Sequence, residues 1–185
     1  VPAGEPRARY ARARLAHGWG DAATARREYQ ALQAQVKRHG GAQLGLALLD
    51  RTAGAGDAGL EDLARGEGDA PAAARALLAR EDLGRGDSRR AAERLRLPRV
   101  GVADLELLGV AEAARGRWLE AAEAFRFAAA RGADAGQAAG RVEAMAAAAL
   151  AARRPEDALR VLVRCAALQG DSDRWRALRR DASAQ

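Results

Sequence analysis

Residues 115–125, RGRWLEAAEAF, decide the fold of this chain. They place Gly116, Trp118, Ala121 and Phe125 at fixed offsets in a segment that otherwise favours a helix. Only Gly or Ala fits where two antiparallel helices cross closely, and bulky residues beside the crossing fill the space to a neighbouring helix. The spacing therefore predicts a hairpin that turns at Gly116, crosses at Ala121 and uses both aromatic rings for packing.

The composition favours the same kind of structure along the whole chain. Of 185 residues, 49% are hydrophobic, Ala supplies much of that fraction, and only 4% are aromatic. A core of Ala and Leu suits closely packed helices, whereas sheets favour β-branched and aromatic side chains. Glycine-centred breaks separate runs of about 10 to 16 residues, a length typical of helical hairpins joined by short turns. We expect a single all-α domain over residues 1–185.

A turn position recurs along the chain and indicates internal repeats. Its anchors are Gly20, Gly56, Gly86, Gly116 and Arg153, the last of which lacks the glycine. Four of the five anchors have a small residue five positions later and a large apolar residue nine positions later. The small residues are Ala25, Ala91, Ala121 and Ala158, and the apolar ones are Tyr29, Leu95, Phe125 and Leu162.

Residues 105–129, LELLGVAEAARGRWLEAAEAFRFAA, resemble a tetratricopeptide (TPR) repeat. Residues 20–32, 86–95 and 152–168 are similar to its second half. The resemblance implies a right-handed superhelical array of antiparallel helix pairs, a TPR-like α-solenoid of about four to five repeats. The expected units are 6–38, 40–66 (degenerate, with Glu61 and Arg65 at the repeat positions), 69–98, 102–134 and 136–170. Trp175 and Leu178 lie among charged residues and predict a C-terminal capping helix over 172–182.

In TPR arrays the first helix of each pair lines a concave groove that takes a peptide, a helix or a partner's loop. The resemblance therefore implies a partner-binding groove, basic and aromatic at its N-terminal end and apolar with acidic spots at its C-terminal end. Some family members clamp an acidic peptide terminus with Asn and Lys, but this chain has no Asn and its only Lys lies outside these positions. The candidate groove residues are Arg7, Tyr10, Arg14, His17, Arg80, Leu83, Glu106, Val110, Glu143, Ala147 and Leu150.

Catalytic patterns do not emerge from the sequence, and we expect no enzyme, no cofactor and no metal site. His17 and His39 lie beside turns, which favours a role at helix C-termini. Ser88 and Ser172 each follow an Asp at a helix start, as N-cap residues do. Cys165 is the only cysteine and lies on an apolar stripe, which predicts a small core residue. No apolar run is long enough for a transmembrane segment.

We therefore expect a non-catalytic protein–protein interaction module, an adaptor or assembly scaffold, that binds another protein or a peptide segment. The alternative is an Arg-rich helical repeat that contacts nucleic acid phosphates through residues 7–14 and 89–99, because the net charge is +6. A third hypothesis is an interaction domain of a larger regulator or envelope complex. Ala-rich helical faces also permit a homodimer. The expected compartment is the cytoplasm, with a mature periplasmic or envelope-associated chain as the alternative.

Overall fold

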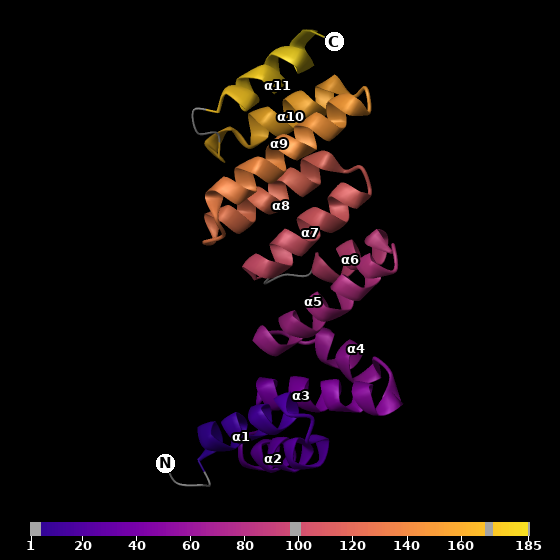
Figure 1. Cartoon of the computed structure of the whole chain (residues 1–185), viewed down its shortest axis with the longest axis vertical. Coiled ribbons are helices and arrows are strands. Elements are labelled where there is room, and N and C mark those ends of the chain that lie inside the picture. The colour runs from indigo at the N-terminus through magenta and orange to yellow at the C-terminus, as the bar shows by residue number, and fades with distance from the viewer. Residues whose placement is uncertain (1–4, 97–100, 169–171, 185) are drawn as a thin grey trace. The chain divides into compact units, whose positions relative to one another are not determined.

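A computed structural model describes residues 5–96, 101–168 and 172–184. Every regular element within these ranges is helical and none of them is a strand, so the all-α prediction is confirmed. The chain divides into two compact units, Val1–Leu78 and Ala79–Gln185, and the division falls within helix α5. Figure 1 labels the helices of both units in chain order.

Unit 1 packs each helix against the next along the chain. Its core has two buried clusters, one around Tyr29 and Leu32 and the other around Leu60 and Leu78. The elements are α1 (Pro6–Gly18), α2 (Ala22–Gln35), α3 (Gly40–Asp50), a π-helical turn η1 (Arg51–Ala55), α4 (Ala58–Ala64) and the first part of α5 (Asp69–Gly84).

A buried arginine joins α4 to α5. The Arg75 side chain is 3% exposed, and its guanidinium donates hydrogen bonds to the backbone carbonyls of Ala64 (2.8 Å) and Gly66 (3.0 Å). The last carbonyls of a helix have no hydrogen-bond donor within the helix, so the Arg75 guanidinium supplies the donor where α4 ends. The short α4 is thereby held on α5.

Among its described residues, unit 2 contains the remainder of α5 and six further α-helices. Neighbouring helices in the chain pack side by side, and α10 also contacts α8. The last residues of the expected units 69–98 and 136–170 lie outside the described residues. The elements are α6 (Ser88–Leu95), α7 (Val102–Ala114), α8 (Trp118–Ala130), α9 (Ala135–Ala151), α10 (Pro155–Arg164), a 3₁₀ turn η2 (Ala166–Leu168) and α11 (Asp173–Ala184).

All five predicted turn anchors have a positive φ angle. The φ angle is +81° at Gly20, +71° at Gly56, +81° at Gly86, +67° at Gly116 and +57° at Arg153. At Gly116 the anchor N–H donates to the Ala113 carbonyl, and the next N–H, from Arg117, donates to Glu112. The turns at Gly20, Gly86 and Arg153 repeat this pair of hydrogen bonds, which is the Schellman pattern of helix ends. Arg153 thus takes the glycine conformation without being a glycine.

The residues of the quoted stretch occupy the packing positions expected for them. Ala121 is fully buried, and Phe125 is 3% exposed in a cluster that also contains Val142 of α9 and Trp175 of α11. The Trp118 ring packs against the same cluster, with the Arg154 guanidinium 5.2 Å from its centroid. Both aromatic rings therefore fill space between successive helices.

Helix α11 covers the end of this cluster. Trp175 is 1% exposed, Leu178 packs beside it, and the helix contacts α9 and α10. Ser172 caps the helix, because its hydroxyl accepts a hydrogen bond from the Trp175 N–H (3.3 Å). The helix begins one residue after the expected start and extends to Ala184.

Two single-residue predictions were wrong, and both concern helix starts. His39 ends no helix; it is the N-cap of α3, and its Nδ1 accepts from the Ala42 N–H at 3.2 Å. Asp87, not Ser88, is the N-cap of α6, and its carboxylate accepts a hydrogen bond from the Arg90 N–H at 3.0 Å. The Asp87 side chain thus reaches a backbone N–H that has no partner within the helix. His17 does lie in the last turn of α1, and Cys165 is fully buried, as expected.

Candidate functional site

Helix α1 brings three of the candidate groove residues together. Tyr10, Arg14 and His17 follow the i, i+4, i+7 spacing that places side chains on one face of a helix. Ala13 and Ala16 lie on an adjacent side and are buried in the unit 1 core. The helix thus presents an aromatic ring, a guanidinium and an imidazole along one stripe.

These three side chains line a depression of about 360 Å³ formed by α1, α2 and α3. The rings of Tyr10 and Tyr29 lie 6.3 Å apart between centroids, and the His17 ring meets Tyr29 edge-on at 6.1 Å. His39 adds a fourth ring, 5.1 Å from Tyr10. The lining also includes Gly18, Gly41, Leu44, Gly45 and Leu48.

Two glycines of α3 make room for the tyrosine rings. A Cβ added at Gly41 would come within 2.6 Å of the Tyr10 hydroxyl, and one at Gly45 would come within 2.4 Å of the Tyr29 ring. Real Cβ atoms do not approach so closely, so a side chain at position 45 would clash with the buried Tyr29 ring and one at position 41 would push the Tyr10 ring aside. The aromatic floor of the depression therefore depends on the GGAQLG segment of residues 40–45.

Positive charge lies at the edge of the depression. The Arg14 side chain is exposed, with its guanidinium 6.0 Å from the centroid of the Tyr10 ring. Arg9 and Arg12, by contrast, both pair with Glu28 of α2 at 3.3 Å. Burial raises the pKa of the Tyr29 hydroxyl above its ordinary value, so that phenol stays protonated at neutral pH. The site can therefore offer a cation and neutral aromatic rings to a ligand.

Of the other candidate groove residues, two on unit 2 helices are held by internal contacts. Glu106 of α7 forms an ion pair with Arg141 of α9 at 3.1 Å. Glu143 accepts a hydrogen bond from the Ser172 hydroxyl at 2.8 Å and helps to position the start of α11. The remaining candidates lie as follows: Arg7 and Arg80 are exposed, Val110 is 45% exposed, and Leu83, Ala147 and Leu150 are half-buried.

Sequence reasoning missed three further surface features. One is a hollow of about 490 Å³ between α8 and α10, where Leu119, Leu159 and Val163 meet beside the Glu123–Arg164 ion pair (2.7 Å). Another is a groove in unit 1 between α3, α4 and the start of α5. Both are formed by residues distant in the sequence, so no pattern within a single helix predicts them.

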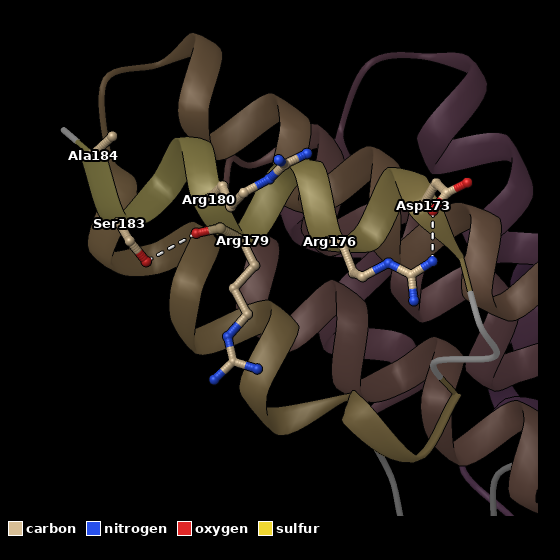
Figure 2. A pocket seen from close by; sticks show the side chains of 6 residues that line it. All are labelled: Asp173, Arg176, Arg179, Arg180, Ser183 and Ala184. Atoms are coloured by element: carbon tan, nitrogen blue, oxygen red, sulfur yellow. Dashed lines mark hydrogen bonds and ion pairs between the residues drawn. The ribbon is translucent and has the colours of Figure 1, made fainter.

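The third feature is the outward face of α11, drawn in Figure 2. Arg176, Arg179 and Arg180 line a shallow depression there, and Arg176 pairs with Asp173 at 2.5 Å. Arg176 and Arg180 are four residues apart and lie away from Trp175 and Leu178, a spacing that predicts a basic helix face.

The arginines suggested for phosphate contacts are largely engaged with carboxylates. Arg94 donates to Asp82 at 2.6 Å, and Arg89 pairs with Glu93 at 3.0 Å. Arg96 pairs with Glu112, which is 1% exposed. Residues 97–99 of the suggested segment lie outside the described residues.

The described ranges contain neither a membrane-spanning helix nor a cluster of metal ligands. No helix there is long and apolar enough to cross a membrane. The same residues contain no group of three or more His, Cys, Asp or Glu side chains that could hold a metal ion.

Comparison with known proteins adds no assignment. No model of a protein family matches this chain, and no curated protein matches it. What can be said of its function therefore comes from its own residues.

Proposed function

We propose that this chain is a non-catalytic protein–protein interaction module, a TPR-like array of helical hairpins that holds a peptide, a helix or a partner's loop. The observation that most supports this is the depression at α1–α3, where Tyr10, Arg14 and His17 line one hollow. Tyr and Arg are the residue types that dominate binding energy in protein interfaces, together with Trp. Rigid scaffolds that expose such residues are suited to recognition.

The lining defines the chemistry of a suitable ligand. Leu44, Leu48 and the ring of Tyr10 offer apolar surface, and Arg14 offers a guanidinium at the edge. A peptide side chain that is apolar or aromatic would pack on the rings, and a neighbouring carboxylate would pair with Arg14. We therefore expect acidic peptides with an aromatic or aliphatic anchor.

Ion pairing makes nucleic acid a less suitable partner than protein. Phosphates would have to compete with Glu28 for Arg9 and Arg12 and with Asp82 for Arg94. Nucleic acid affinity rests on counterion release from clustered cations, and these cations already have carboxylate partners. A fluorescently labelled oligonucleotide that bound tightly at low salt, with affinity falling steeply as salt rises, would favour the alternative instead.

The test is selection of a random-peptide display library on the full chain, followed by calorimetric titration of the enriched peptides. Arg14→Ala should weaken binding by about 10-fold, equivalent to about 1.4 kcal/mol. Arg27→Ala is the matched control, because Arg27 is an exposed arginine of α2 that does not line the depression. Failure to enrich any peptide, or equal losses for both variants, would argue against this site.

A further inference from the structure

Unit 1 contains a groove whose charge is opposite to that of the chain. It lies between α3, α4 and the first turn of α5 and has a volume of about 870 Å³. Leu46, Leu63 and Pro71 give it apolar surface. Four carboxylates and one guanidinium, that of Arg38, line it, so its lining carries a net charge of −3 in a chain of net charge +6. The carboxylates belong to Asp50, Asp62, Glu67 and Asp69.

The ion pairs already present in this groove are weak enough to be exchanged. Asp50 pairs with Arg26 and Asp62 with Arg65, each at 2.6 Å, and all four side chains are more than a third exposed. Exposed pairs of this kind contribute about 0–1 kcal/mol. An incoming guanidinium can therefore replace Arg26 or Arg65 at little cost.

One of the glycines that line the groove leaves open space beside it. At Gly68 an added Cβ would meet nothing within 4 Å, whereas at the other four it would meet atoms of this chain. Gly68 therefore leaves room for an approaching backbone. The glycines are Gly40, Gly41, Gly59, Gly66 and Gly68.

The complementary surface is on α11 in unit 2. Figure 2 shows the side chains of Arg176, Arg179 and Arg180 on α11, a helix whose Trp175 is buried. Arg179 lies one turn from Trp175 and lines a small cavity with it, whereas Arg176 and Arg180 lie farther around the helix. In the part of the chain that the structure describes, no carboxylate forms an ion pair with Arg179 or Arg180. These guanidiniums are thus available to a partner.

We propose that α11 of one copy docks in the α3–α5 groove of a second copy. Residues 176–183 make two turns and carry all three arginines. The contact joins different surfaces of the two copies, so it is heterologous and assembles chains head to tail.

This self-association does not depend on the peptide site proposed at α1–α3. Gly41 borders both hollows, but Tyr10, Arg14 and His17 do not line the groove, and α11 contributes nothing to their depression. Loss of assembly and loss of peptide binding can therefore be separated by mutation.

Two charge-reversal variants test the contact by sedimentation velocity and light scattering. One changes the groove (Asp62→Lys with Glu67→Lys), and the other changes α11 (Arg176→Glu with Arg180→Glu). At low salt the wild-type mass should rise with concentration above the 19.5 kDa of one chain, and at about 0.5 M salt it should return to that value because charges are screened. Arg85→Glu with Arg89→Glu is the matched control, since both side chains are exposed and neither surface contains them.

Each reversed variant alone should be monomeric, since either the groove or α11 then repels its partner. Their mixture should assemble again, because the intact α11 of one variant fits the intact groove of the other, and the reversed α11 and the reversed groove are also complementary in charge. A wild type that stays monomeric at low salt would overturn the proposal. So would reversed variants that assemble like the control, or a mixture that forms no complex. Circular dichroism melting of each variant separates lost docking from lost folding.

Discussion

Gly109 of α7 lies directly against the ring of Phe125 in α8. A Cβ added at Gly109 would come within 2.5 Å of a ring carbon of Phe125, and that ring is 3% exposed. The same relation recurs in unit 1 between Gly45 of α3 and the Tyr29 ring of α2. In both places the absence of one side chain sets how closely two helices pack.

Gly109→Ala should therefore destabilise the chain even though Ala favours helices. Overpacking a buried contact costs about 1–3 kcal/mol, more than the gain in helix propensity. Gly140→Ala in α9 is the control, because nothing lies within 4 Å of a Cβ there, and it should stabilise by up to about 1 kcal/mol. Urea denaturation followed by circular dichroism measures both, and equal shifts for the two variants would disprove the close crossing.

Arg153→Gly should stabilise the chain. Arg153 has a φ of +57°, a conformation that costs a non-glycine residue about 1–2 kcal/mol, partly offset by the extra entropy of unfolded Gly. The net gain should be up to about 1 kcal/mol in the same urea experiment. Ala152→Gly, one residue earlier at φ −82°, should instead lose about 0.5–1 kcal/mol. A loss at both positions would show that the turn at Arg153 has another geometry.

Glu112→Gln should destabilise unit 2. The Glu112 carboxylate is buried and pairs with Arg96 and Arg115, the latter at 3.0 Å. Removing its charge weakens hydrogen bonds worth about 1.5–3 kcal/mol each, although these arginines can still reach water. Glu123→Gln breaks only the exposed pair with Arg164 and should cost less than about 1 kcal/mol. Thermal melts compare the two, and a smaller loss at Glu112 than at Glu123 would contradict the account.

The thiol of Cys165 should react slowly while the chain is folded. Burial raises the pKa of this thiol from 9.0 to about 11, so little thiolate forms at pH 8. Its contribution to stability is full below pH 9.0 and is lost as the pH rises through about 11, because the unfolded thiol ionises first. Labelling with a chromogenic disulfide reagent at pH 8 should be slow in buffer and complete in urea.

Trp175→Ala should accelerate that labelling. Trp175 of α11 and Cys165 belong to one buried cluster. Removing the Trp175 ring leaves a cavity and weakens the packing of α11 over Cys165. Arg180→Ala, an exposed position of α11 away from Trp175, should leave the rate unchanged. Equal rates in all three proteins would show that α11 does not cover the cluster.

The turns and helix pairs were predictable because their causes are local. A residue in the left-handed conformation ends a helix, and glycine adopts that conformation readily. The sequence therefore predicts the turns at Gly20, Gly86 and Gly116. The packing roles of Trp118 and Phe125 follow from helical spacing alone. Arg153 was found only through its place in the repeat, since Arg itself does not favour the turn.

The site was predictable only on α1. Helical spacing puts Tyr10, Arg14 and His17 on one face, but their partner Tyr29 and the glycines of α3 reach them through the tertiary fold. Glu106 was expected in an open groove, yet it pairs with Arg141, which is 35 residues away in sequence. Such pairings depend on which helices become neighbours, so spacing within one helix could not reveal them.

The most direct test of the interaction role is a nuclear magnetic resonance titration of the isotopically labelled chain with a display-selected peptide. The account predicts that the largest shift changes fall on Tyr10, Arg14, His17 and the facing Gly45 of α3. It also predicts that saturating peptide leaves the α8 and α10 signals in place. Changes confined to unit 2, with α1 unaffected, would contradict the assignment of the binding site to α1–α3.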